Sequence, residues 1–180
     1  MDLRLCDMDM TTIATLSFLV FILLVCWAAL NDLVRFEIPN AIPIAIAVFF
    51  IPTALLLDWE MTAILKHLAV GGGTLVLGFL LFMWGYFGGG DAKLLAAINI
   101  WTGPDAMYAY FFFVAIAGGI FALMLLGFRR LALPNFLQQI AWVERLHRGR
   151  KYIPYGVAIS SGAVAILNQI PSFELLFLVS

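Results

Sequence analysis

Long apolar stretches, separated by short polar segments, occupy almost the whole chain. The apolar stretches run near 12–30, 41–57, 63–86, 92–101, 107–128 and 153–170. A helix crosses a bilayer with about 20 residues at a rise of about 1.5 Å per residue, and most of these stretches meet that length. The stretch at 92–101 does not, because Trp101-Thr102-Gly103-Pro104-Asp105 interrupts it. Either neighbouring helices shield it or it begins inside the bilayer, and both options place Asp91 at or slightly below the membrane surface. The pattern predicts an all-α polytopic membrane protein with about six transmembrane helices.

Composition supports this class and leaves little room for a second domain. Of the 180 residues, 64% are hydrophobic and 12% are charged, and the mean hydropathy is +1.03. A soluble domain has about 45–50% apolar residues and about 25% charged ones. No polar region is long enough to fold separately, so we expect residues 1–180 to form a single integral membrane domain. Residues 1–7 are acidic, unlike a signal peptide, so the first stretch is expected to be a retained membrane helix.

Metal-binding and disulfide patterns are missing from the sequence. The two cysteines, Cys6 and Cys26, form no C-x-x-C pair, and His67 and His147 are isolated. These patterns predict neither a zinc site nor a disulfide framework. We therefore expect no metal, no cofactor and no nucleic-acid partner.

The distribution of basic residues orients the predicted helices. With the N-terminus outside, the inner loops and their helix edges hold eight of the 10 Lys and Arg residues: Arg35, Lys93, Arg129, Arg130, Arg145, Arg148, Arg150 and Lys151. Cytoplasmic loops are enriched in Lys and Arg, so we expect both termini to be periplasmic. On this topology Asp32 ends the first helix and Asp91 begins the fourth, which places both acids at the cytoplasmic face.

Local signals refine the helix ends and the packing. Asn40 is expected to cap the second helix. Small residues let membrane helices approach closely, so glycines inside the third and fifth helices are interpreted as packing positions. These glycines are Gly71, Gly72, Gly73, Gly78, Gly118 and Gly119.

The segment at about 134–150 is expected to lie on the cytoplasmic membrane surface as an amphipathic helix. With Asn135 as its cap, a helix over 135–148 places Phe136, Ile140, Val143 and Leu146 on one face. Basic residues nearby are interpreted as anchors for anionic headgroups, which makes membrane lipid an expected partner. They are Arg145, Arg148, Arg150 and Lys151.

Asp32 and Asp91 are the candidates for chemistry. Ionisable groups at the edge of hydrocarbon are costly, so their presence favours a functional role. Asp91 follows Gly88-Gly89-Gly90, a backbone that adopts positive φ easily and lets another chain come close. Two carboxylates that meet in a poorly solvated cleft share one proton and suit acid/base chemistry on water or a peptide bond. A helix cap at Asp91 and a water-exposed loop acid at Asp32 remain alternatives.

Three motifs, in this order, resemble those of type IV prepilin peptidases. Asp32 precedes Ile38-Pro39-Asn40, then Gly88-Gly89-Gly90-Asp91 fits the G-x-G-D signature of intramembrane-type aspartyl proteases, and Tyr152-Ile153-Pro154-Tyr155-Gly156 follows. The chain looks most like the small prepilin peptidase of tight-adherence (Flp-type) pilus systems.

The resemblance implies an aspartic endopeptidase with Asp32 and Asp91 as its catalytic pair. The implied substrates are prepilins and pseudopilins, cut at the cytoplasmic face of the inner membrane between a short basic leader and an apolar helix. Substrate contacts are expected at Gly88, Gly89, Gly90, Lys93, Pro154 and Gly156. Longer family members carry an added cytoplasmic domain with paired cysteines and methylate the new N-terminus. Since 31–40 is only a short turn here, we expect no methyltransferase activity.

Two other functions stay open on the sequence alone. One is a small transporter or proton-relay subunit, in which membrane acids bind cations or pass protons. The other is a non-catalytic pilus-assembly subunit whose aspartates only cap helices. A transporter often carries a two-fold repeat and polar groups near the bilayer midplane. The sequence has no convincing repeat, and both acids belong to one face.

Overall fold

The computed structural model describes residues 10–148, 153–173 and 176. Predictions for the N-terminal tail, including Cys6, and for Arg150, Lys151 and Tyr152 fall outside these ranges. The described part is helical, without strands, which confirms the all-α class. Its helices are α1 (Met10–Arg35), α2 (Ala41–Leu56), α3 (Met61–Met83), α4 (Gly89–Arg130), α5 (Asn135–Gln138), α6 (Ala141–Arg148) and α7 (Tyr155–Ala165). Two short 3-10 turns follow, η1 (Leu167–Gln169) and η2 (Pro171–Phe173).

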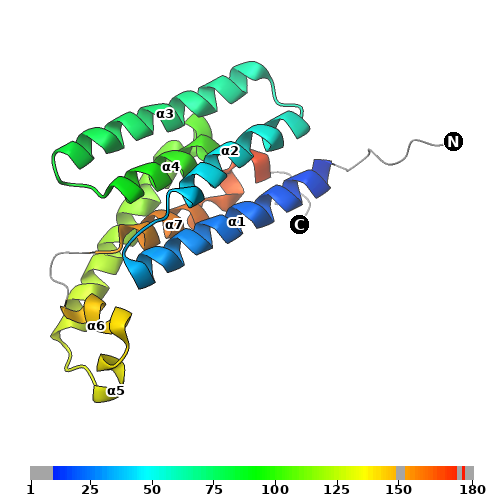
Figure 1. Ribbon diagram of the computed structural model, residues 1–180. Helices are drawn as coiled ribbons and strands as arrows, with labels where there is room; N and C mark the ends of the chain where they lie inside the picture. The colour runs from blue at the N-terminus through cyan, green and yellow to red at the C-terminus, as the bar shows by residue number, and fades with distance from the viewer. Residues whose placement is uncertain (1–9, 149–152, 174–175, 177–180) are drawn as a thin grey trace.

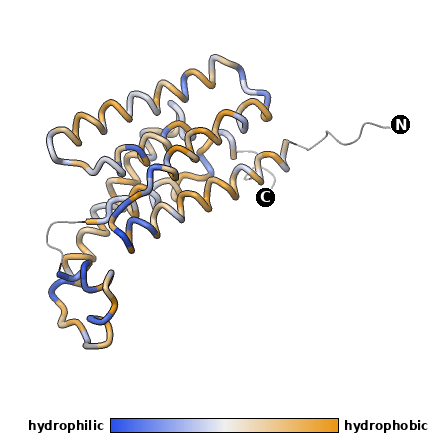
Figure 2. The backbone as a smooth tube through the Cα atoms, in the orientation of Figure 1, coloured by the Kyte–Doolittle hydropathy of each residue, from blue (hydrophilic) through white to orange (hydrophobic). Residues whose placement is uncertain are grey.

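The helices of the bundle carry the apolar character expected of membrane spans. Within the described residues, α1, α3 and α4 are long and apolar enough to cross a membrane, and α2 and α7 are shorter apolar helices. Hydrophobic residues run along the helices, and hydrophilic residues gather at turns and around α6 (Figure 2). Many apolar side chains are exposed on the outer surface of the bundle. Exposed Leu23, Val48 and Phe79 illustrate this outer surface. A multi-pass membrane protein follows, as the sequence predicts.

Helix α4 reverses direction at Gly103 and so accounts for two of the predicted helices. Gly103 has φ 61° and ψ −167°, a conformation that excludes most side chains. A Cβ at this position would also overlap the ring of His67. The first limb, 89–102, lies beside α3, and the second limb returns toward the end where α4 began (Figure 1). The interruption predicted at 101–105 is therefore a tight helical reversal, and the short limb is shielded by its neighbours.

The reversal determines which ends of the helices lie together. The end of α1, the starts of α2, α4 and α7, and the end of α3 gather at one end of the bundle (Figure 1). The first described residues of α1 and the end of α7 lie at the opposite end. This arrangement brings Asp32 and Asp91 to the same end of the molecule.

The segment after α4 differs from the single surface helix expected over 135–148. It forms two short helices, α5 and α6, with a break at 139–140, and Pro134 rather than Asn135 occupies the N-cap position of α5. The break lets α6 fold back against the end of α4, where Arg129 Nε donates to the Leu146 carbonyl at 3.0 Å. His147 Nε2 lies 2.9 Å from the Leu131 carbonyl and secures the same contact. One straight helix would carry α6 away from these partners.

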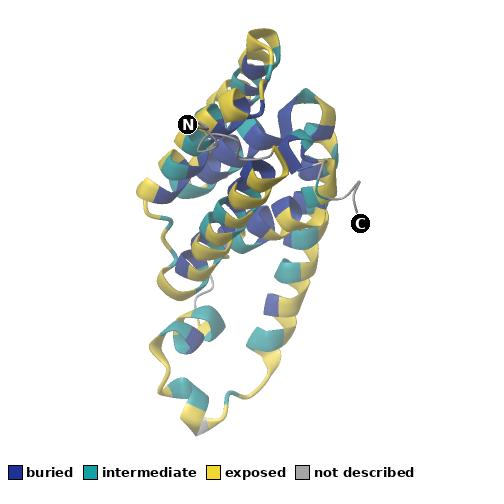
Figure 3. Ribbon diagram, turned by 90° about the vertical axis from the view of Figure 1, so that its right-hand side faces the viewer, coloured by how far each residue is buried: buried dark blue, intermediate teal, exposed yellow. Residues whose placement is uncertain are grey.

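The second limb of α4 extends beyond the bundle and carries this helical pair (Figure 3). Val143 is buried against the limb, while Phe136 and Ile140 are exposed. The apolar face predicted for one helix is thus divided between contact with α4 and the surface.

The core lies where α1, α2, the first limb of α4 and the last 3-10 turn meet. Trp101 is fully buried and contacts the rings of Phe21, Phe50 and Phe173. Its Nε1 donates to the Ile46 carbonyl at 2.9 Å, which satisfies the only polar atom of the indole. Aromatic packing around Trp101 therefore holds the short first limb inside the bundle.

The glycines interpreted as packing positions divide into two groups. A Cβ at Gly71 would overlap Ile100, and one at Gly78 would lie 2.8 Å from the Ala92 Cβ, so both hold α3 close to α4. Gly118 packs in the same way against Tyr155 of α7. Gly72, Gly73 and Gly119 have no atom within 4 Å of such a Cβ, so for them the packing interpretation is wrong.

Replacing Trp101 by alanine is expected to lower the free energy of unfolding by about 3–5 kcal/mol, because truncation of a buried aromatic leaves a cavity. The matched control is Trp84→Ala, since Trp84 is 68% exposed. Denaturant unfolding of both variants in the same detergent checks the difference. An equal loss at the two positions would contradict a core centred on Trp101.

Candidate active site

Asp32 lies in the last turn of α1 and is held by the start of α7. Its side chain is buried, with 5% of its surface exposed. The Gly156 backbone N–H donates to Asp32 Oδ2 at 2.6 Å, and the backbone N–H of Val157 also bonds the carboxylate. The first N–H groups of a helix have no partner within the helix and favour negative charge. Asp32 therefore occupies an anion site built by a helix that is distant in the sequence.

Gly156 makes this contact possible because it has no side chain. A Cβ at Gly156 would lie 2.7 Å from Asp32 Oδ2, 3.0 Å from Asp32 Cβ and 2.8 Å from Ile38 Cδ1. Such distances are too short for real Cβ atoms, so a larger residue has to displace Asp32 or Ile38. Gly156 lies behind the carboxylate as a positioning residue.

Asp91 occupies the first turn of α4, three residues after the N-cap residue Gly88. The Gly88 backbone N–H bonds its carboxylate, which is the reciprocal half of a capping box. The carboxylates of Asp91 and Asp32 are also close enough to interact electrostatically. The helix cap and the meeting of two acids, which the sequence leaves as alternatives, occur together at Asp91.

The glycines before Asp91 let other parts of the chain pack close to this backbone. Gly88 has φ −75°, and the glycines with positive φ are Gly85 and Gly103 among the described residues. A Cβ at Gly88 would lie 2.5 Å from Asp91 Oδ2, and one at Gly90 would lie 3.3 Å from the Ile38 Cβ. The three glycines do not use positive φ, and another chain does come close to them, as the sequence indicated.

The chain that comes close is the turn between α1 and α2. Phe36, the first residue after α1, has φ 58°, an uncommon conformation for a residue with a side chain, and its N–H donates to the Asp32 carbonyl at 2.9 Å. The turn then carries Ile38 between Gly90 and Gly156. One residue of this turn therefore contacts the segments that position both acids.

A cavity of about 360 Å³ opens between these elements. It is lined by Asp32, Phe36, Glu37, Ile38, Asn40, Gly88, Gly89, Gly90, Asp91, Ile153 and Pro154. Of the predicted site residues, the structure gathers both aspartates, the three glycines and Pro154 around it. Phe36 and Glu37 line it without having been assigned a role from sequence, although the shortness of the turn after Asp32 is a signal that its residues stay near that acid.

Lys93 and Gly156, also predicted to contact substrate, do not line this cavity. Lys93 Nζ donates to Asn40 Oδ1 at 2.8 Å and turns toward a separate groove between α2, α3 and α4. The same bond occupies the side chain of Asn40, which stands at the N-cap position of α2 as predicted but makes no side-chain capping hydrogen bond.

The histidines lie away from the carboxylate pair. His67 is buried between Phe50 and Trp59 toward the opposite end, and its Nδ1 lies 2.7 Å from the Ile100 carbonyl. Within the described ranges, no group of three or more His, Cys, Asp or Glu side chains is placed to hold a metal ion. The two neighbouring aspartates can act as acid and base on water and a carbonyl.

Comparison of the sequence with known proteins finds a match to one protein family. A family model described as the type IV leader peptidase family matches residues 19–123, a range that includes both aspartates and ends before α7. No curated protein and no solved structure matches the chain significantly.

Replacement of Gly156 by alanine is expected to displace the Asp32 carboxylate and weaken its bond to the residue 156 amide. That amide should exchange its hydrogen at least about tenfold faster. A loss of about 1.4 kcal/mol in the stability of the bond raises the fraction of molecules in which the amide is open by tenfold. Gly89→Ala is the control, because its Cβ would lie no closer than 3.5 Å to any atom. Hydrogen exchange of both variants in detergent provides the measurement, and unchanged protection in Gly156→Ala would count against this geometry.

Proposed function

Because the chain belongs to the type IV leader peptidase family, we propose that it is an aspartic endopeptidase that removes the leader from prepilins and pseudopilins. The observation that carries this proposal is that Asp32 of α1 and Asp91 of α4, which are 59 positions apart in the sequence, line one cavity. Membership of the family supports peptidase activity and pilin substrates in general. The pair of acids supplies the reason for an aspartic mechanism.

The two aspartates share one proton, and in this mechanism one acts as the general base while the other donates a hydrogen bond to the substrate. Asp32 accepts two backbone N–H groups at the start of α7, so it is the acid better suited to carry the negative charge. It draws a proton from a water molecule, whose oxygen attacks the carbonyl carbon of the scissile peptide bond. Protonated Asp91 donates a hydrogen bond to the carbonyl oxygen. As the tetrahedral intermediate collapses, the C–N bond breaks and the leaving amine receives the proton that Asp32 took from the water, which returns Asp32 to its ionised form.

The lining of the cavity suits the leader of a prepilin. Glu37 adds a third acid to the lining, and no Lys or Arg is among the described residues that line the cavity. A cationic leader would be drawn to this negative potential. The close approach of the 36–40 turn and the glycine loop leaves a cavity with backbone on two sides, which suits an extended peptide. A tight-adherence prepilin is the first substrate to test.

The proposed location is the inner membrane, with the cavity facing the cytoplasm. Arg35, Arg129 and Arg130 end the helices that run toward the cavity end of the molecule. Basic residues favour the cytoplasmic side, so the opposite end, where the described part of α1 begins and α7 ends, is proposed to face the periplasm.

The proton-relay alternative receives no specific support from the interior. Between the two ends, Asn99 Nδ2 donates to Thr74 Oγ1 at 2.9 Å, and Thr102 Oγ1 donates to Asn99 Oδ1 at 2.8 Å. These groups satisfy one another and do not ionise. Among the described residues, no chain of ionisable side chains leads inward from the carboxylate pair.

Asp32→Asn and Asp91→Asn are each expected to lower prepilin cleavage by at least about 10²–10⁴-fold, because either change removes the shared proton chemistry. The assay follows the size of a co-expressed prepilin on a gel while the amount of membrane-inserted enzyme is measured in parallel. The control is Asp58→Asn, since Asp58 is exposed on the turn between α2 and α3. A variant of either catalytic acid that accumulates and still cleaves would refute the mechanism, and a scaffold protein would tolerate both changes.

The cleaved pilin is expected to keep an unmethylated N-terminus, because the α1–α2 turn is too short to hold an added domain. Mass spectrometry of the mature pilin after co-expression tests this, with a methylated pilin from a long-form enzyme as reference. A mass increase of one methyl group that depends on this chain would show the expectation to be wrong.

A further inference from the structure

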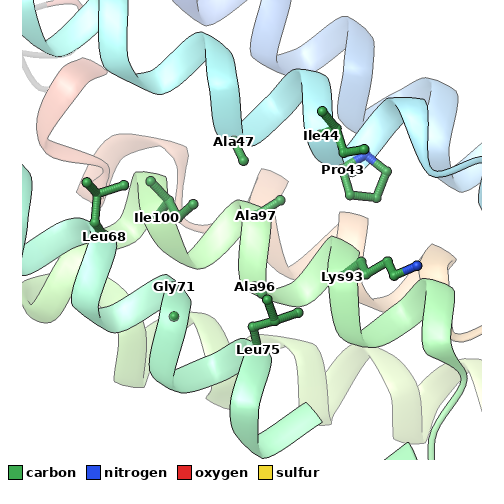
Figure 4. A pocket seen from close by; sticks show the side chains of 11 residues that line it. Pro43, Ile44, Ala47, Leu68, Gly71, Leu75, Lys93, Ala96, Ala97 and Ile100 are labelled. Atoms are coloured by element: carbon green, nitrogen blue, oxygen red, sulfur yellow. The ribbon is translucent and has the colours of Figure 1, made fainter. Parts of the chain in front are cut away.

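A second hollow lies on the outer face of the bundle, between α2, α3 and the first limb of α4. It is a groove of about 310 Å³. Its walls carry Pro43, Ile44 and Ala47 from α2, Leu68, Gly71, Gly72 and Leu75 from α3, and Lys93, Ala96, Ala97 and Ile100 from α4 (Figure 4). Lys93 is the one charged residue of this set and lies at one end of the groove. The rest of the groove is apolar.

The groove begins where the carboxylate cavity ends. Lys93 follows Asp91 by two residues in the first turns of α4, and its Nζ donates to Asn40 Oδ1 at 2.8 Å. Asn40 in turn lines the carboxylate cavity. From Lys93 to Ile100 the first limb rises about 10 Å, so the groove extends from the cavity end about one third of the way through the hydrocarbon. Lys93 lies at the end of the groove next to the cavity, where its long side chain can extend the ammonium group to the lipid headgroups.

Missing side chains keep the groove open. Gly72 lines it, and a Cβ there would meet no atom within 4 Å. Ala47, Ala96 and Ala97 are the small residues of the other two walls. An engineered apolar cavity of about 150 Å³ accepts one benzene ring, so about 310 Å³ accommodates roughly two side chains of that size. A helix that presents apolar residues at i and i+3 or i+4 fits such a groove.

We propose that this groove binds the apolar helical segment that directly follows the scissile bond of the substrate. The inference rests on the proposed peptidase function and names the surface that selects its substrates. A polypeptide that enters the polar cavity at the membrane surface and continues into the bilayer has to leave the cavity along its apolar neighbour. The groove shares the Asn40–Lys93 boundary with the cavity, so it lies directly on that path. Small residues on its walls allow close helix approach.

The decisive variant is Gly72→Leu, which fills the groove from a position with free space around it. Gly73→Leu is the matched control, because Gly73 is the next residue, has equally free space and does not line the groove. Each variant is assayed with a prepilin that keeps its apolar segment and with a short peptide that ends soon after the scissile bond. Gly72→Leu is expected to lower kcat/KM for the full prepilin about tenfold or more and leave the short peptide unchanged. Gly73→Leu should change neither.

Photo-crosslinking provides a second measurement, which does not depend on a substitution that fills the groove. A photoreactive residue at Leu75, which lines the groove, should capture the apolar segment of the prepilin in an Asp91→Asn background. The same residue at exposed Val76, outside the groove, should not.

Three results would overturn the groove proposal. They are full activity of Gly72→Leu on the prepilin, an equal loss on both substrates, or capture of phospholipid alone at position 75 in the Asp91→Asn background while prepilin is present. The first shows that the substrate does not use the groove, the second that the substitution disturbs the fold, and the third that lipid occupies the groove. If the unmodified protein cleaves neither substrate, the peptidase function itself is wrong, and the groove proposal is withdrawn with it.

Discussion

The site depends above all on the bond between a carboxylate at the end of α1 and the backbone N–H groups at the start of α7. Asp32 is buried, and a buried carboxylate needs hydrogen-bond donors to remain there. The Gly156 N–H supplies one at 2.6 Å, and the contact is possible because residue 156 has no Cβ. The same absence leaves room for Ile38, which also lies against Gly90 at the entrance to α4. One helix N-terminus and two glycines therefore hold three separate segments of chain around the pair of acids.

A second constraint is the reversal at Gly103. The positive φ of this glycine and the His67 ring packed against it turn α4 back on itself within the bundle. Without the turn, the chain would leave the first limb at the wrong end and α7 would not start beside Asp32. Trp101, two residues earlier, anchors the turn in the aromatic core. The stability of the core and the geometry of the carboxylates are thus linked through a single limb of helix.

Family membership and geometry contribute different parts of the functional argument. The family match spans residues 19–123 and supports a leader peptidase. The contacts made by α7, beyond that range, distinguish the two acids, since Asp32 is held by N–H groups from another helix and Asp91 by the cap of its own. The adjoining apolar groove provides a reason why such an enzyme would act on peptides that continue into a membrane. Under the proposed function, the polar cavity would hold the charged part of the substrate and the groove its apolar part.

The sequence by itself determined the helical membrane class, the interruption at 101–105 and the common end for Asp32 and Asp91, because hydropathy and charge asymmetry act along the chain and need no knowledge of contacts. It also indicated that the glycines before Asp91 allow a close chain. It did not determine which chain comes close, that Gly156 supports Asp32 from behind, or that Lys93 bonds Asn40 and faces a groove. The single helix expected over 135–148 failed for the same reason, since contacts of α6 with the end of α4 break it. These features depend on which side chains meet across helices, and such distances exist only in the folded molecule.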